Sequence, residues 1–169
     1  DLAMDTPATL KLFDHPYEIH RLDRGTGQAT FVVQTALIGV AAMAFGPGDI
    51  LYLVEDPSAP LGNGYDLMTL DLNTGVAVRI GATGLNTIGT LDFDDQGKLW
   101  AYDRYAGILQ LDLNTGAVTD INPGFSGPPD PTKSMVFDEN GALWMIDIAV
   151  WVGDTTTGVR PVFVLGAAG

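Results

Sequence analysis

A five-residue motif, Asp-x-x-Thr-Gly, recurs four times along the chain and constrains its fold more than any other feature. The copies are Asp23–Gly27, Asp71–Gly75, Asp112–Gly116 and Asp154–Gly158. Their glycines are separated by 48, 41 and 42 residues. Periods of this length are typical of architectures in which similar units stack side by side. The sequence therefore predicts one domain of 169 residues that is built from four similar units.

A second motif precedes the first in each unit. An apolar residue is followed six positions later by Leu, in the pairs Met4/Leu10, Phe45/Leu51, Phe93/Leu99 and Phe137/Leu143. A turn-forming segment, such as Asp94–Gly97 or Asp138–Gly141, lies between the two residues. Because two independent motifs recur in the same order, we interpret them as parts of one structural repeat.

The composition indicates that the repeat is made of strands. Only three of the 21 acidic residues are Glu, and only three residues are Lys, whereas Asp and Gly are abundant. Glu and Lys favour helices, and Asp and Gly favour turns. We expect four strands in each unit. The first strands are Leu2–Met4, Ala41–Phe45, Thr90–Phe93 and Ser134–Phe137; the second are Leu10–Phe13, Ile50–Val54, Leu99–Tyr102 and Leu143–Ile146. The third are Ile19–Leu22, Leu67–Leu70, Ile108–Leu111 and Val150–Val152; the fourth are Ala29–Val33, Val76–Ile80, Ala117–Ile121 and Val159–Val164.

The strand lengths and the repeat period predict an all-β fold, a β-propeller of four four-stranded blades. The blades span residues of about 1–34, 39–81, 88–122 and 133–165 of a single domain, 1–169. Each Asp-x-x-Thr-Gly motif is predicted to close the hairpin between a third and a fourth strand. Its Asp side chain bonds to the nearby backbone, and its Gly supplies the positive φ of the turn.

The blades resemble bacterial β-propeller repeats of the NHL and YVTN type. The resemblance is clearest in Leu91–Gly116 and Met135–Asp147, and the repeat covers nearly the whole chain. It implies a secreted or cell-surface bacterial protein, and it specifies the blade more strongly than the function. The propeller lactonases that resemble this fold hold a metal in the central channel with Glu, Asn and Asp. That ligand set does not match inward positions of this sequence, so lactonase activity is not carried over.

Closure of the propeller is open at this stage. The chain could form a closed four-blade ring, part of a larger propeller, or a ring completed by further copies. Both ends are apolar, with Leu2, Met4, Leu10 and Leu12 at one end and Val162, Phe163, Val164 and Leu165 at the other. We therefore expect both end blades to be covered, in the first instance by each other. The first residue is Asp rather than Met, which favours a processed secreted product or an excised fragment.

Charge and cysteine content exclude several function classes. The net charge of −13 argues against binding of nucleic acid or of an anionic membrane through a basic surface. No apolar run approaches the length of a membrane-spanning helix. The absence of Cys excludes disulfides, thiol catalysis and Cys-ligated metals.

Motif searches indicate no catalytic residues and no cofactor. No nucleophile elbow, zinc-protease motif or phosphate-binding loop occurs. His15 and His20 are the only histidines, and we expect a packing or surface role for His20. The segment Asp92–Asp103 resembles a calcium loop, with oxygen ligands at positions 1, 3 and 5 and Gly at position 6. We interpret it as a hairpin between strands, although calcium remains an alternative ligand.

The loops that join second to third strands and fourth to next first strands share one face of a propeller, here called the loop face. Both long insertions, 55–66 and 122–133, fall there, and such insertions mark binding surfaces. The candidate ligand or partner residues on this face are His15, Tyr17, Tyr65, Arg104, Tyr105 and Phe125. Tyr, Phe, His and Arg suit rigid contacts to proteins or carbohydrates.

A carboxylate ends the second strand of every blade, in Asp14, Glu55, Asp103 and Asp147. We interpret each of these residues as a structural hydrogen-bond acceptor for the next loop; the alternative is a ring of ligands. The sequence thus predicts a non-catalytic binding or assembly module for a protein or carbohydrate. The alternatives are a calcium-dependent hydrolase or lactonase with a channel metal, and a structural subunit that forms a homo-oligomeric ring or array.

Overall fold

The computed structural model describes residues 17–56, 64–121, 134–146, 149–154 and 158–164, with residues from 146 onward described by their backbone alone. Within these ranges the regular elements are β-strands, apart from one 3-10 turn at Pro47–Asp49. No helix among the described residues is long and apolar enough to cross a membrane.

The strands form four antiparallel sheets in chain order. The first sheet pairs β1 (Glu18–Leu22) with β2 (Ala29–Gln34). The second contains β3 (Val40–Phe45), β4 (Leu51–Glu55), β5 (Asp66–Leu70) and β6 (Ala77–Ala82). The third contains β7 (Ile88–Phe93), β8 (Leu99–Asp103), β9 (Gly107–Leu111) and β10 (Val118–Asp120). The fourth contains β11 (Ser134–Phe137), β12 (Leu143–Ile146), β13 (Ala149–Asp154) and β14 (Gly158–Val164). We call these sheets blades 1 to 4.

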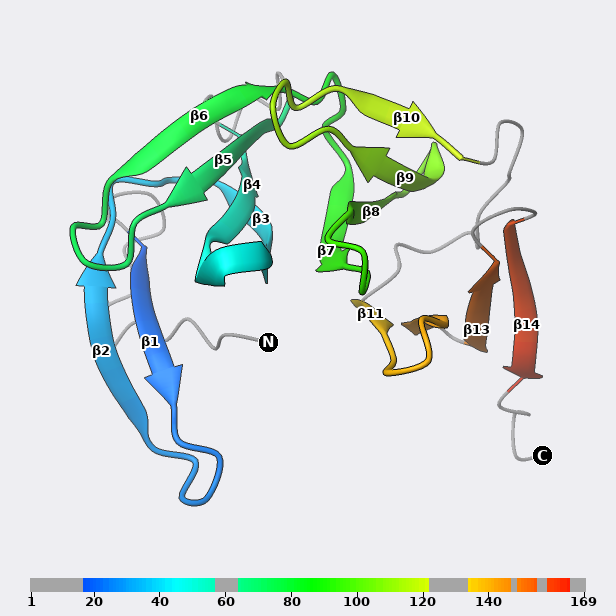
Figure 1. Ribbon diagram of the computed structural model, residues 1–169, viewed down its shortest axis with the longest axis horizontal. Coiled ribbons are helices and arrows are strands. Elements are labelled where there is room, and N and C mark those ends of the chain that lie inside the picture. Colours follow the sequence, from blue (N-terminus) through cyan, green and yellow to red (C-terminus); the bar gives the residue numbers. More distant parts are fainter. Residues whose placement is uncertain (1–16, 57–63, 122–133, 147–148, 155–157, 165–169) are drawn as a thin grey trace.

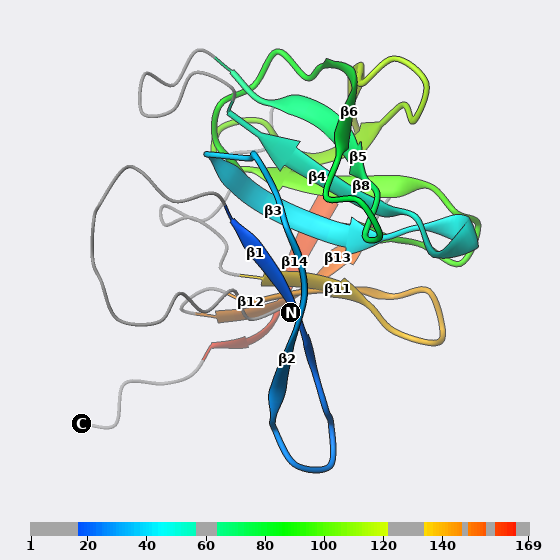
Figure 2. The ribbon, with the colours of Figure 1, turned by 90° about the vertical axis from the view of Figure 1, so that its left-hand side faces the viewer.

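The blades follow one another along an arc, with β3, β7 and β11, the first strands of blades 2 to 4, on the inside (Figure 1). Strand β7 lies between β3 and β11, so the innermost strands of blades 2, 3 and 4 are neighbours. The outermost strands β2, β6, β10 and β14 lie on the outer side of the arc (Figure 1). The view from the side shows the strands of blades 2 and 3 stacked closely over each other (Figure 2).

The predicted strands of blades 2, 3 and 4 are confirmed with small shifts. Strands β3 and β7 begin earlier than predicted, because Ala41 and Gly89 each add one unpaired residue to the inner strand and preserve the pairing on either side. Strand β10 is shorter than the predicted Ala117–Ile121. In blade 1 the third and fourth strands are confirmed as β1 and β2. The predicted strands Leu2–Met4 and Leu10–Phe13 lie outside the described residues.

The Asp-x-x-Thr-Gly motifs form the predicted hairpins in blades 1, 2 and 3. In blade 3, Oδ1 of Asp112 accepts hydrogen bonds from the backbone N–H groups of Asn114 and Thr115, both at 2.9 Å. The Gly116 N–H donates to the Asp112 carbonyl at 2.8 Å, and the φ of Gly116 is 74°. The turn is therefore stabilised by bonds within five residues, which explains why its conformation is readable from the sequence.

Hydrophobic cores fill the spaces between neighbouring blades. Val54 and Leu67 of blade 2 pack with Leu99 and Leu111 of blade 3 in one cluster. Ile19 of blade 1 packs with blade 2 in a second cluster, and Trp100 of blade 3 packs with blade 4 in a third. Burial is thus greatest where two blades meet, and this arrangement holds the loops of successive blades in a fixed relation.

The ring expected from the apolar ends is not closed in the described residues. Blade 1 and blade 4 lie at the two ends of the arc (Figure 1). Phe31 of β2 is 54% exposed, so the end of blade 1 is not covered by blade 4. The physical reason is the stacking of successive blades, which follows an open arc instead of turning tightly enough to bring the fourth blade back to the first.

Candidate functional site

The loop face of blades 2 and 3 is organised by backbone bonds between connections that are distant in sequence. The N–H of Tyr65, just before β5, donates to the Leu85 carbonyl at 2.7 Å. The Thr83 hydroxyl donates to the Tyr65 carbonyl at 2.8 Å. The Arg104 N–H donates to the Thr87 carbonyl at 3.3 Å. These bonds tie the 83–87 connection to the loops on both of its sides.

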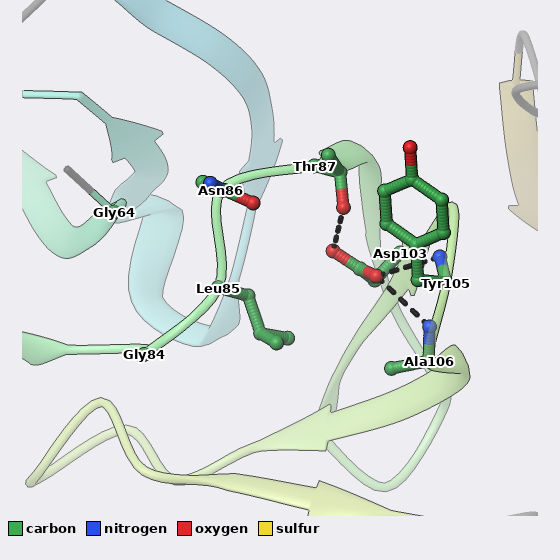
Figure 3. A pocket seen from close by; sticks show the side chains of 8 residues that line it. All are labelled: Gly64, Gly84, Leu85, Asn86, Thr87, Asp103, Tyr105 and Ala106. Atoms are coloured by element: carbon green, nitrogen blue, oxygen red, sulfur yellow. Dashed lines mark hydrogen bonds between the residues drawn. The ribbon is translucent and has the colours of Figure 1, made fainter. Parts of the chain in front are cut away.

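A pocket of about 320 Å³ lies among these connections (Figure 3). Its lining residues come from three segments of the chain: Gly64, Gly84, Leu85, Asn86, Thr87, Asp103, Tyr105 and Ala106. The pocket thus lies between the β6–β7 connection and the β8–β9 loop, on the face where the sequence predicted binding. We call it the loop pocket.

Asp103 organises the loop pocket from its buried side. One carboxylate oxygen, Oδ2, accepts a 2.6 Å hydrogen bond from the Thr87 hydroxyl, and the other, Oδ1, accepts bonds from the N–H groups of Tyr105 and Ala106 at 2.8 and 2.9 Å (Figure 3). Asp103 is only 1% exposed, so these three donors replace its solvation. The carboxylate fixes both walls of the pocket at once.

The predicted acceptor role of the second-strand carboxylates for the following loop is confirmed at Asp103, whereas the bond of Glu55 goes to the preceding connection. Oε1 of Glu55 accepts a 2.8 Å hydrogen bond from the Ile38 N–H, so it also holds the connection that precedes its own blade. Asp14 and Asp147, the corresponding residues of blades 1 and 4, lie outside the described residues.

Tyr105 and Arg104 stand at the rim of the loop pocket. Tyr105 is 74% exposed, and its ring rises beside the Thr87–Asp103 pair with the hydroxyl turned away from Asp103 (Figure 3). The Arg104 guanidinium carbon lies 5.6 Å from the centre of the Tyr105 ring, within the range of a cation–π contact. Of the four predicted residues that the structure describes, Arg104 and Tyr105 are exposed, whereas Tyr17 and Tyr65 are partly buried.

Tyr17 and Tyr65 have structural contacts in addition to their place on the loop face. Tyr17 packs against the blade 1–blade 2 core and Tyr65 against the blade 2–blade 3 core. The carbonyl of each accepts a bond from a threonine hydroxyl, Thr35 at 3.0 Å and Thr83 at 2.8 Å. His15 and Phe125 lie outside the described residues.

Buried carboxylates lie close to the Tyr65 phenol at this face. Burial raises the pKa of the Tyr65 phenol, and the negative charges of Asp56 and Asp103 raise it further. Both carboxylates are buried, and Glu55 is buried beside Asp56. A site edged by these charges favours positively charged groups.

Sequence reasoning did not single out Leu85, Asn86 and Thr87, which supply much of the pocket lining. The repeat does contain a signal for this connection. Tyr65 and Thr83 lie 48 residues after Tyr17 and Thr35, and the second hairpin glycine lies 48 residues after the first. The matching hydrogen bonds of these two pairs show that the shift preserves the anchoring of the fourth-to-first-strand connection.

A second hollow, of about 690 Å³, lies along the innermost strands β3, β7 and β11. Its polar lining side chains include Thr90, Asp92 and Ser134. Oδ2 of Asp92 accepts a 2.6 Å bond from the Phe137 N–H, which links blade 3 to blade 4. Within the described part of the chain there is no group of three or more His, Asp or Glu residues with metal-binding geometry.

The calcium-like segment forms the β7–β8 hairpin, as the sequence predicts. Oδ1 of Asp94 accepts bonds from the N–H groups of Gln96 and Lys98 at 2.9 and 2.8 Å, and Oδ2 accepts a bond from Nε1 of Trp100 at 2.9 Å. Both oxygens of this carboxylate therefore serve the hairpin.

Comparisons with known proteins identify the fold. No family model matches the sequence, and no curated protein matches it. The chain is similar to a gluconolactonase from Xanthomonas campestris at 16% identity and a TM-score of 0.58, covering 92% of this chain and 47% of that one. It is similar to TolB from Acinetobacter baumannii at 15% identity and a TM-score of 0.62, covering 90% and 39%. It is also similar to a chain of a nidogen/laminin complex at 15% identity and a TM-score of 0.63, covering 89% and 59%.

These similarities concern the fold alone, because the identities are low. The chain spans roughly two fifths to three fifths of the length of these propeller structures. They include a gluconolactonase and a chain of a nidogen/laminin complex, which agrees with the use of one fold for many functions. The protein has a β-propeller fold.

Proposed function

We propose that the protein is a non-catalytic binding module, secreted or at the cell surface, that engages a protein partner through its loop face. The observation that carries the proposal is the exposed Tyr105 ring, with Arg104 over it, beside the loop pocket. An exposed aromatic ring whose backbone is held by a buried carboxylate offers contact area at little entropic cost.

The charges around the pocket indicate the chemistry of the partner. Glu55, Asp56 and Asp103 are buried behind the face, and the whole chain carries a net charge of −13. A partner segment with Lys or Arg side chains near an apolar anchor fits this field, and the anchor packs on Tyr105. A pocket of about 320 Å³ suits one or two side chains of such a segment.

The test is a selection of random 12-residue peptides displayed on phage against the immobilised chain. The selected peptides should be enriched in Lys and Arg, and their binding should weaken as salt is raised. Tyr105→Ala should lower their affinity at least tenfold. Val78→Ala, on the outer strand of blade 2 and 59% exposed, should leave the affinity unchanged. Equal binding by both variants would contradict the proposal.

Carbohydrate is the other ligand class predicted from the sequence, and a glycan array with the same two variants distinguishes it. If oligosaccharides bind in a way that depends on Tyr105 and the phage selection yields no peptides, the ligand of this site is a carbohydrate. We place the protein partner first because one of the similar structures is a chain of a nidogen/laminin complex.

A calcium-dependent hydrolase or lactonase is the second candidate, favoured by the hollow that contains Asp92 and by the similarity to a gluconolactonase. Calorimetry with Ca²⁺ separates the two functions. Tight binding at one site that is lost in Asp92→Asn would favour the enzyme, whereas an absence of heat would leave the binding module as the proposal. A lactone-hydrolysis assay on the same samples completes the comparison.

A further inference from the structure

The joints between successive blades share a contact that is absent at the outer side of blade 1. A Cβ atom added to the hairpin glycine Gly75 of blade 2 would lie 2.1 Å from the Gln34 carbonyl oxygen at the end of β2. A Cβ atom added to Gly116 of blade 3 would lie 2.5 Å from the Gly81 carbonyl oxygen in β6. In both joints, the third-to-fourth-strand hairpin of one blade touches the outer strand of the preceding blade.

Gly27 has the same local conformation without this contact. Its φ is 72°, against 73° and 74° at Gly75 and Gly116, and its N–H makes the same 2.8 Å bond to the motif aspartate. A Cβ atom added to Gly27 would meet nothing within 4 Å among the described residues. The hairpin of blade 1 therefore has the geometry of a joint, but no strand touches it within the described part of the chain.

A leucine at the end of the third strand gives an independent measure of the same difference. Leu70 of β5 and Leu111 of β9 are 4% and 3% exposed, because the preceding blade covers them. Leu22 of β1 occupies the same place before the motif and is 38% exposed. The motif that follows each of them is the same, and Leu70 packs with Ile19 of the preceding blade as Leu111 packs with Val54 and Leu67.

The uncovered face of blade 1 is apolar. Phe31 pairs with His20 across the β1–β2 ladder, their rings meet edge to face at 5.8 Å, and Phe31 is 54% exposed. By strand alternation Leu22 lies on the same side as His20, whereas Ile19 and Val33 contact blade 2. An exposed Phe and Leu beside an unoccupied hairpin form a surface of the kind that other blades bury.

We propose that this face binds the fourth blade of a second copy of the chain, so that two copies close one propeller. The contact continues the joint already present between blades 1 and 2 and between blades 2 and 3. The described blades follow an open arc (Figure 1), and a second copy joined at this face continues that arc towards a closed ring. A twofold axis makes the two blade 4–blade 1 joints identical. This surface is separate from the loop pocket.

The absence of Cys from the chain allows a direct test by disulfide trapping. Val164 at the end of β14 pairs with Ala149 as Gln34 pairs with Glu18, five residues before the motif aspartate in each blade, and the Gln34 carbonyl is the atom nearest to a Cβ on Gly75. The Thr115 carbonyl oxygen is the atom nearest to a Cβ on Gly81, and Thr26 corresponds to Thr115 in blade 1. Mixing the Thr26→Cys chain with the Val164→Cys chain under mild oxidation should give a covalent heterodimer.

Thr74→Cys mixed with Val164→Cys is the matched control, because the Thr74 hairpin is exposed in the same way but already touches blade 1. The proposal requires at least tenfold more heterodimer from the Thr26 pair than from the Thr74 pair. Equal trapping would overturn it. A Thr26→Cys/Val164→Cys chain that cross-links only within itself would also overturn it, in favour of closure by its own fourth blade.

Light scattering during gel filtration gives a readout that does not depend on cysteine. The unmodified chain should elute with twice the mass of one chain, and Phe31→Glu should shift it to the monomer. Val78→Glu places the same charge on the outer strand of blade 2 and should leave the dimer intact. A monomer at all concentrations for the unmodified chain would overturn the proposal.

Discussion

Gly81 and Gly116 pack backbone against backbone across the joint between blades 2 and 3. A Cβ atom on Gly116 would lie 2.5 Å from the Gly81 carbonyl oxygen, and a Cβ atom on Gly81 would lie 1.9 Å from the Thr115 carbonyl oxygen. The motif glycine therefore has two roles: it supplies the positive φ of its own turn, and it allows the next blade to approach.

We predict that Gly116→Ala destabilises the protein more than Gly141→Ala. Both glycines have positive φ, 74° and 77°, so both variants incur backbone strain of about 1–2 kcal/mol. Only the Cβ at position 116 overlaps another blade, which adds about 1–3 kcal/mol. Urea denaturation followed by tryptophan fluorescence measures both free energies of unfolding. Equal losses would show that the blades separate easily at this joint.

Thr87→Val should destabilise the loop pocket. The substitution removes the 2.6 Å hydrogen bond to Oδ2 of Asp103 and leaves a buried carboxylate without that donor. The expected loss is about 1–3 kcal/mol of unfolding free energy. Thr87→Ser keeps the hydroxyl and should restore most of the stability. A loss as large in the Ser variant as in the Val variant would assign the effect to packing.

Trp144→Phe should raise the pKa of Asp138. The indole Nε1 of Trp144 donates a 2.8 Å hydrogen bond to Oδ2 of Asp138, and this bond is the main cause that holds the pKa of the carboxyl below its ordinary value of 3.8. Carbon-detected NMR titration of the carboxyl groups measures the change. Asp112, whose pKa is lowered chiefly by the backbone N–H of Asn114, is the internal control and should not move.

The stability of the protein should fall in acid because of the turn aspartates. Hydrogen bonds to Asp23, Asp71, Asp112 and Asp138 lower their pKa values in the folded state. A lowered folded pKa stabilises the fold above the unfolded pKa, about 3.9, and this contribution is lost as pH falls through the folded pKa. Urea midpoints should therefore drop below about pH 4. Asp112→Asn keeps an acceptor oxygen in the turn, and its midpoint should change less between pH 7 and pH 3.

The blade and its turns were predictable because their chemistry is local. The Asp71 side chain accepts a bond from the Asn73 N–H, the Gly75 N–H donates to the Asp71 carbonyl and the Asp71 N–H donates to the Val76 carbonyl, so six consecutive residues contain these partners of the turn. The alternation of the flanking strands and the 41 to 48-residue period then indicate repeated antiparallel sheets. The exposed Tyr105 and Arg104 were predicted from the position of their loop. The contribution of Thr87 was not predicted, because its partner Asp103 lies 16 residues away at the end of β8.

The sequence by itself therefore determined the strands, the hairpins and the face on which the loops gather, since these depend on residues that are near one another in the chain. The tertiary structure decided how the blades meet. Gly27 and Gly75 occupy the same motif with nearly equal φ, yet one faces open space and the other touches Gln34. Leu22 and Leu70 differ in the same way. Such differences are set by whether a neighbouring sheet is present, and an identical local sequence carries no information about that neighbour.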